Sequence, residues 1–214
     1  MAYQGEAVAA AGLRSPQEQD DARASRVSAY CVLAGLLRAA PDAGRLAQLA
    51  ALPLTEDQGR EAPLGTAWRG LRNAAAQADA AAVNDEYHDL FIGFGRGELL
   101  PYASWYLAGA LMDRPLLALR LDLKRLGIAR AAGNREPEDH VAALCETMAL
   151  LIGSGDEGLP LATQRDFFTA HLAPWLGRFF GDLQASERAH FYRSVAAFGT
   201  AFSEFERAWL SMPG

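Results

Sequence analysis

Residues 136–152, EPEDHVAALCETMALLI, decide the fold of this chain. Their apolar side chains recur at the i, i+3, i+4 spacing of a helix that buries one face, namely Val141, Leu144, Cys145, Met148, Leu151 and Ile152. Pro is favoured at the first helical position, so we predict a helix from Pro137 to about Ile152. Glu138 and Asp139 would then lie in its first turn, where the helix dipole stabilises carboxylates. His140 would border the buried face.

The rest of the chain has the same helical character. Its 214 residues include 43 alanines and 30 leucines, against nine isoleucines and valines together. Ala and Leu favour helices, whereas β-branched residues favour strands. We therefore predict an all-α fold: one bundle-like domain of about nine helices over residues 1–214, with a flexible N-terminus at 1–15. Helices are expected over 16–40, 102–112 and 115–127, among others, and loops at 93–97 and 130–136.

Charge and hydropathy exclude several classes of partner. The net charge of −6 argues against binding nucleic acid, which requires a basic face, and suits a cationic partner. No uncharged apolar run approaches the roughly 20 residues that span a bilayer. The first residues lack the basic start of a signal peptide. We expect a cytoplasmic protein with no stable membrane insertion.

The two cysteines, Cys31 and Cys145, lie in apolar, helix-like stretches. Without CxxC spacing they indicate neither a disulfide framework nor a zinc site. We expect both to be buried free thiols.

An aromatic segment follows the glycine-rich loop at 93–97. The loop lacks the strand, spacing and Lys-Ser/Thr pair of a phosphate-binding loop. Residues 99–107, LLPYASWYL, then place three aromatic side chains within five positions. Tyr102 and Tyr106 are four residues apart and would share a helix face. They are either part of the core or an aromatic wall beside a groove that grips a partner.

Catalytic and metal-binding interpretations find less support. Glu187 and His190 form an ExxH pair, and Asp85 and His88 a DxxH pair. A di-metal site on a helical bundle needs two ExxH pairs and two further inward carboxylates. We expect no catalytic residues, no metal and no cofactor, so that the protein is not an enzyme. A helical adaptor that binds a folded partner is the other alternative.

Three motifs together resemble a known family. They are Tyr87-x-x-Leu90-Phe91, Pro101-Tyr102-x-Ser104 and Glu136-Pro137-x-Asp139-His140. In residues and spacing they resemble the TorD/DmsD/NarJ family of redox-enzyme maturation chaperones. The family pattern usually has a Pro at the position of Leu100 and an acid at that of Ala103.

The resemblance implies an all-α cytoplasmic chaperone that performs no reaction. It would bind the twin-arginine leader and the apo-form of the catalytic subunit of a molybdopterin-dependent oxidoreductase, of formate-dehydrogenase type, and assist cofactor insertion before export. The residues that would line or support the leader-binding surface are Tyr87, Leu90, Phe91, Pro101, Tyr102, Ser104, Trp105, Glu136, Pro137, Asp139 and His140.

The chemistry of such a leader agrees with this interpretation. Two guanidinium groups followed by an apolar stretch require carboxylates that pair with Arg and an apolar groove.

The Gly153–Gly158 segment would act as a hinge that permits exchange of the C-terminal helices between protomers. We expect a monomer with some domain-swapped dimer.

Overall fold

The described part of the chain is helical, and aspartates cap several of its helices. The computed structural model describes residues 16–52, 62–93, 97–130, 133, 135–155 and 158–212. Over these ranges it contains ten α-helices, one π-helical turn and no strand, which confirms the all-α prediction. Asp42, Asp79 and Asp113 each cap the helix that follows by accepting a hydrogen bond from a backbone N–H. The predicted flexible N-terminus, 1–15, lies outside the described residues.

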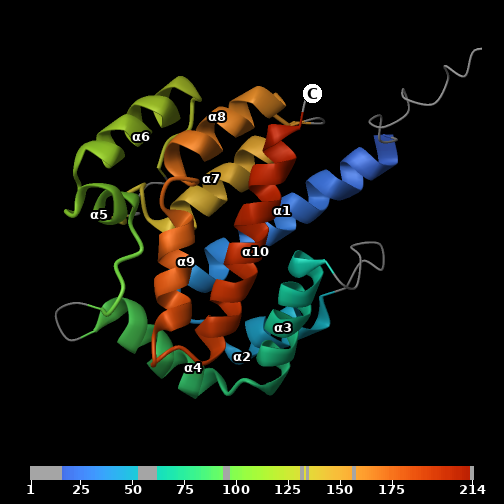
Figure 1. Ribbon diagram of the computed structural model, residues 1–214, viewed down its shortest axis with the longest axis vertical. Coiled ribbons are helices and arrows are strands. Elements are labelled where there is room, and N and C mark those ends of the chain that lie inside the picture. Colours follow the sequence, from blue (N-terminus) through green and yellow to red (C-terminus); the bar gives the residue numbers. More distant parts are fainter. Residues whose placement is uncertain are drawn as a thin grey trace, which may run out of the picture.

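The helices differ in length, and so do the connections between them (Figure 1). Their bounds are α1 Pro16–Arg38, α2 Ala43–Ala51, α3 Pro63–Gln77, α4 Ala80–Tyr87, η1 His88–Ile92, α5 Ala103–Ala108, α6 Arg114–Arg125, α7 Val141–Gly153, α8 Leu161–His171, α9 Leu176–Ala185 and α10 Phe191–Ser211.

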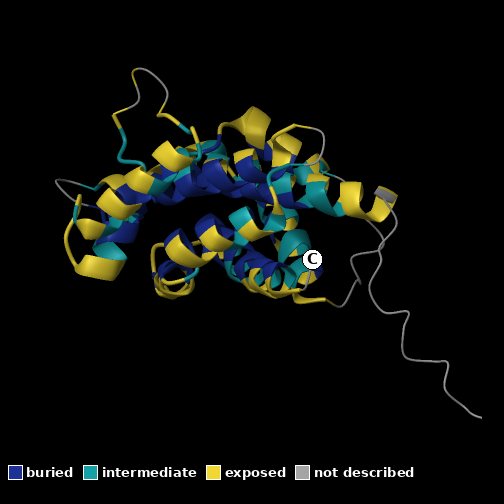
Figure 2. Cartoon of the chain, turned by 90° about the horizontal axis from the view of Figure 1, so that it is seen from above, coloured by how far each residue is buried: buried dark blue, intermediate teal, exposed yellow. Residues whose placement is uncertain are grey.

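The core lies between α1, α7 and α10. Helix α1 packs along α7, and α10 packs against α3 and α9. Buried residues gather on the inner faces of the helices, whereas exposed residues cover the outside (Figure 2). Inside this core, Arg26 of α1 forms a buried ion pair with Glu206 of α10 and donates a hydrogen bond of 2.9 Å to Gln164 of α8. A buried charge persists where it is paired, so this network joins three helices.

Helix α7 begins later than the sequence predicts. It starts at Val141, so Pro137 is not at its first position, and Glu138 and Asp139 are not in its first turn. Instead, His140 N–H donates to the carbonyl of Pro137 at 3.2 Å, which closes a turn before the helix. Pro with acidic residues after it suits a turn as well as a helix start, so the local pattern was ambiguous.

The segment predicted as a helix over 102–112 is shorter. Helix α5 ends at Ala108 because Gly109 adopts a left-handed conformation, with a φ of 75°. Tyr102 has an extended backbone and precedes the helix. Consequently Tyr102 and Tyr106 do not share a helix face.

The predicted burial of both cysteines is half right. Cys145 is buried on α7, but Cys31 is exposed on α1. Partial burial raises the pKa of the Cys31 thiol and full burial raises that of Cys145, and the charge of Glu146 acts in the same direction on both.

The predicted loop at 93–97 and the predicted hinge at Gly153–Gly158 are described only in part. Positions 94–96 and 156–157 lie outside the described residues. None of the described helices is both long enough and apolar enough to cross a bilayer.

Candidate functional site

Two motif segments far apart in sequence lie side by side through an isolated antiparallel bridge between Tyr102 and His140. Ala103 N–H donates to the carbonyl of Asp139 at 3.0 Å, and Val141 N–H donates to the carbonyl of Pro101 at 2.8 Å. We call residues 101–104 and 136–140 together the bridge site. The backbone bonds fix the relative positions of the two segments.

Asp139 holds the bridge site from inside. Its side chain is fully buried, and its Oδ2 accepts a hydrogen bond of 2.8 Å from Ser104 N–H, at the start of α5. The carboxylate therefore satisfies a helix N-terminus that belongs to the other segment. Its Oδ1 is buried with no hydrogen-bond partner among the described residues. Asp139 thus acts as a support and is not accessible to a partner.

His140 also has a supporting role. Its Nδ1 accepts a hydrogen bond of 3.1 Å from Ala142 N–H and caps α7. Burial lowers the pKa of His140 to about 4, with Glu136 opposing this shift and Arg38 adding to it. The ring is therefore neutral near pH 7, as its acceptor role requires. It packs edge-on against Tyr102, with ring centroids 5.1 Å apart.

Tyr102 and Glu136 form the half-buried part of the bridge site. The Tyr102 hydroxyl donates a hydrogen bond to Glu136 Oε1. Burial, that hydrogen bond and the negative charge of Glu136 all raise the pKa of Tyr102 above its ordinary value. A carboxylate that remains partly exposed beside an aromatic ring is suited to receive a cationic side chain.

The Tyr87-x-x-Leu90-Phe91 motif contacts the segment that leads into the bridge site. The Tyr87 hydroxyl donates to the carbonyl of Arg38 at 2.9 Å, and the Tyr87 and Phe91 rings are 5.1 Å apart. The carbonyl of Leu90 accepts a hydrogen bond of 2.8 Å from Leu99 N–H. Gly97 lets the chain return closely, because a Cβ there would lie 2.4 Å from the backbone carbon of Phe91. The motif therefore positions residues 99–104.

The aromatic pair of the 99–107 segment is divided between two surroundings. Tyr102 faces Glu136 and His140, whereas the Tyr106 hydroxyl donates to Asp182 of α9 at 3.0 Å. Arg178 of α9 donates in turn to the carbonyl of Tyr106 at 2.6 Å. Tyr106 thus fastens α5 to α9, and Trp105 remains half-buried beside it.

The predicted site residues fall into two groups by burial. Four are half-buried and can line a surface, namely Tyr102, Trp105, Glu136 and Pro137. Seven are buried and can only support it, namely Tyr87, Leu90, Phe91, Pro101, Ser104, Asp139 and His140. All three motifs converge, but most of their residues determine shape rather than contact.

Metal ligands do not converge in the described ranges. There, no group of three or more His, Cys, Asp or Glu side chains could hold a metal ion. The side chains of both candidate pairs are exposed, namely Glu187 and His190, and Asp85 and His88.

Sequence analysis overlooked the structural role of Glu86, which follows Asp85. Its buried carboxylate accepts hydrogen bonds of 2.7–3.0 Å from the backbone N–H groups of His190, Phe191 and Tyr192. It fastens α4 to the start of α10.

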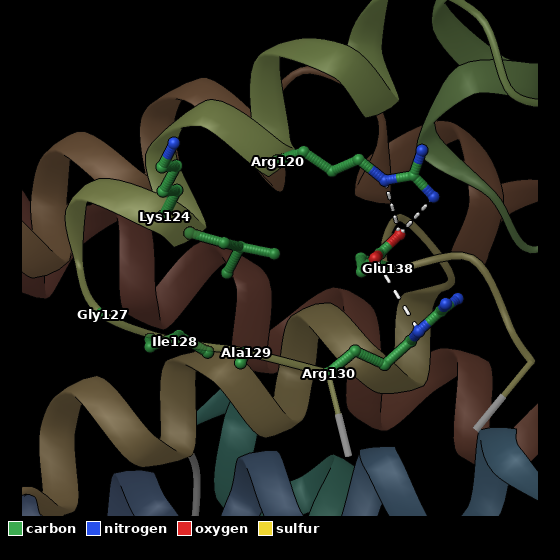
Figure 3. A pocket seen from close by; sticks show the side chains of 8 residues that line it. Arg120, Lys124, Gly127, Ile128, Ala129, Arg130 and Glu138 are labelled. Atoms are coloured by element: carbon green, nitrogen blue, oxygen red, sulfur yellow. Dashed lines mark hydrogen bonds and ion pairs between the residues drawn. The ribbon is translucent and has the colours of Figure 1, made fainter. Parts of the chain in front are cut away.

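A cavity of about 430 Å³ adjoins the bridge site on the side of α6. It is lined by Arg120, Leu123, Lys124, Gly127, Ile128, Ala129, Arg130 and Glu138. Arg120 and Arg130 approach Glu138 from two sides, at 2.8 and 3.9 Å (Figure 3). Partial burial acts to raise the pKa of Glu138, but the hydrogen bond from Arg120 and the two positive charges lower it. Three of the lining side chains are basic and one is acidic, a balance that the acidic whole-chain composition conceals.

Comparisons with known proteins show the family of the chain. The family model of the nitrate reductase delta subunit matches residues 57–181, which include all three motifs. Chaperone protein TorD of Vibrio cholerae serotype O1 (strain O395) is 31% identical over 140 residues, or 62% of each chain. The Haemophilus influenzae protein named "Probable Tat proofreading chaperone DmsD" is 30% identical over 116 residues, covering 53% of this chain and 55% of its own.

A solved structure has the same fold. It is described as that of a redox enzyme maturation protein from Archaeoglobus fulgidus, and it matches with a TM-score of 0.53 over 92% of this chain and 98% of its own, at 20% identity. The all-α fold and the joined motif segments thus define a protein of the TorD/DmsD class. The chain belongs to the nitrate reductase delta subunit family, within the TorD/DmsD/NarJ group of redox-enzyme maturation chaperones. The match to the curated TorD spans 62% of that protein's length.

Proposed function

We propose that this protein is a cytoplasmic chaperone for a molybdopterin-dependent oxidoreductase. It binds the twin-arginine leader of the apo-enzyme, delays export until the cofactor is inserted, and performs no reaction itself. It needs no cofactor of its own. Two of its relatives are named as a TorD chaperone and a probable Tat proofreading chaperone, which supports this function.

The observation that carries the proposal is the bridge site. It brings the half-buried side chain of Glu136 beside the half-buried ring of Tyr102, and Trp105, which is also half-buried, follows three residues later in α5. A twin-arginine leader offers guanidinium groups next to an apolar stretch, and these need a carboxylate and apolar contact area. Single exposed ion pairs contribute only about 0–1 kcal/mol, so the apolar contacts supply most of the affinity.

Calorimetric titration with a synthetic twin-arginine leader peptide tests the function. We expect saturable binding at tens of micromolar or tighter, competition by a second leader, and weaker binding when both arginines are replaced by lysines. Lysine cannot form the two-pronged contact of a guanidinium. The absence of heat and of competition, or equal binding of the lysine peptide, would contradict the proposal.

The client is a finer part of the proposal. We propose a formate-dehydrogenase-type catalytic subunit, because the sequences of residues 99–107 and 136–152 resemble those of family members that accompany such enzymes. Affinity purification of the tagged chain from its host, followed by mass spectrometry, should recover the apo-form of that subunit with its leader. Recovery only of a folded, cofactor-loaded partner without a leader would favour an adaptor instead.

The oligomeric state is a further part. We propose a monomer that forms some domain-swapped dimer through the Gly153–Gly158 segment. Gly155 and Gly158 both have positive φ, at 64° and 75°, which other residues adopt at a cost. Light scattering should show a dimer fraction that Gly158→Ala changes, because a Cβ there would lie 2.4 Å from the carbonyl oxygen of Ile152. An unchanged dimer fraction would contradict exchange at this hinge.

A further inference from the structure

The outer side of α5 and α6 carries the main exposed apolar area of the described chain. Eight large apolar side chains are exposed among the described residues, and five of them lie between positions 107 and 121. They are Leu107, Leu111, Met112, Leu117 and Leu121, with exposed fractions of 39–69%. Helices α5 and α6 lie at one edge of the molecule, away from α3 (Figure 1). Clustered apolar exposure of this kind marks a surface for interaction.

Helix α6 presents this area as a stripe. Leu116, Leu119 and Leu123 bury the inner face, so Leu117 and Leu121 add a second, outward apolar row that the core does not need. Arg114 is seven residues from Leu121, and Leu117 is seven from Lys124. Seven residues are nearly two helical turns, so these four side chains follow one line along the helix. We call Arg114, Leu117, Leu121 and Lys124 the α6 stripe.

Both ends of the α6 stripe are positively charged. Arg114 and Lys124 are exposed, and no described residue pairs with either side chain. Lys124 also lines the cavity, on whose other side Arg120 and Arg130 pair with Glu138 (Figure 3). The chain as a whole has a net charge of −6, so a basic stripe here is a local feature and not a consequence of composition.

The turn that leads into α6 is strained. Met112 has a φ of 59°, the one positive value at a non-glycine position among the described residues, and its side chain is 69% exposed. Such backbone conformations occur at functional sites when the surroundings hold them. Here the holder is Ser104, whose Oγ accepts a hydrogen bond of 3.2 Å from Met112 N–H, while Ser104 N–H is bound by Asp139. The bridge site thus supports this turn.

We propose that the α6 stripe docks an amphipathic helix of a partner protein, one with leucine-like side chains flanked by carboxylates. The apolar row takes the leucines, and Arg114 and Lys124, which are ten residues apart, pair with acids about three turns apart. This surface is distinct from the bridge site, because its charge repels the arginines of a leader. A second copy of this chain would bring like charges together, and the net negative charge disfavours an anionic membrane.

The proposal goes beyond the proposed function and is tested separately from it. The probe is a capped 15-residue helical peptide with leucines at i, i+3, i+4 and i+7 and glutamates beside them. The control peptide has lysines in place of the glutamates. Lys124 is the only lysine of the chain, so protection of its amine from acetylation reports occupancy at one known position.

We expect the glutamate peptide to bind the full chain and protect Lys124 at least fivefold. In calorimetric titration, which does not depend on the Lys124 amine, Leu117→Ser/Leu121→Ser and Lys124→Glu should each weaken peptide binding about tenfold or more, about 1.4 kcal/mol. The matched control is Leu150→Ser, since Leu150 is 55% exposed against 59% for each stripe leucine but lies on α7. This variant should bind normally, and all variants should keep the melting temperature of the unmodified chain to within about 4 °C.

The proposal is overturned if the lysine peptide binds equally well, if neither peptide binds, or if Leu150→Ser weakens binding as much as the stripe variant. Vesicles of anionic phospholipid that protect Lys124 while the peptide does not would also overturn it, in favour of a membrane surface. Titration of the same variants with the twin-arginine leader should show unchanged affinity. Loss of leader binding in the unmodified chain would count against the proposed function alone.

Discussion

The bridge site and the α6 stripe lie near each other but are built in opposite ways. The bridge site has buried supports and two backbone hydrogen bonds that join its segments, and it exposes only parts of Tyr102, Glu136, Pro137 and Glu138. The stripe consists of exposed side chains on a regular helix. Sequence motifs identified the first region and missed the second. Motif residues here mostly fix a shape, whereas a docking surface of simple composition has no motif.

The largest contrast should appear in acid, at His140. Its pKa is about 4 in the folded chain against an ordinary 6.5, so the folded state disfavours its protonation. The contribution of the neutral His140 ring to the free energy of unfolding is therefore fully present above pH 6.5. It is lost as the pH falls to about 4, a change on the order of 3 kcal/mol. Denaturant unfolding of the unmodified chain and of His140→Asn, at pH 7 and pH 4.5, measures it.

Asn can cap α7 as His140 does but does not titrate. The free energy of unfolding should therefore fall more in the unmodified chain than in the variant when the pH is lowered from 7 to 4.5. Parallel pH profiles would show that His140 is not buried in its neutral form.

Asp139→Ala should give the next largest effect. The substitution removes the acceptor for Ser104 N–H and leaves that donor buried. We expect the free energy of unfolding to fall by about 1–3 kcal/mol, with helicity retained below the transition. Urea unfolding followed by circular dichroism measures it. A loss below about 0.3 kcal/mol would mean that the bridge site tolerates the missing cap.

The same measurement on the stripe should give the smallest effect. Leu117 and Leu121 are each 59% exposed, so Leu117→Ser/Leu121→Ser should change the free energy of unfolding by no more than about 0.5 kcal/mol per site. A loss comparable to that of Asp139→Ala would place these leucines in the core and remove the contrast between the two regions.

Local rules predicted the all-α fold well, because composition, apolar spacing and caps such as Asp42 and Asp113 act within one helix. They were wrong where a distant segment decides. Asp139 looked like an acid in the first turn of its own helix, but it caps α5 because the bridge brings Ser104 to it. Backbone hydrogen bonds join the segments that carry the three motifs of the resemblance. The resemblance could not say which of their residues are accessible, since burial depends on the whole fold.

The central claim is that Glu136, partly exposed at the bridge site, receives an arginine of the leader. A double-mutant cycle tests it directly, with Glu136→Gln in the chain and single Arg→Gln substitutions in the leader peptide, measured by calorimetric titration. We predict a coupling energy of about 1 kcal/mol with one of the two arginines. Additive losses with both arginines would contradict the claim.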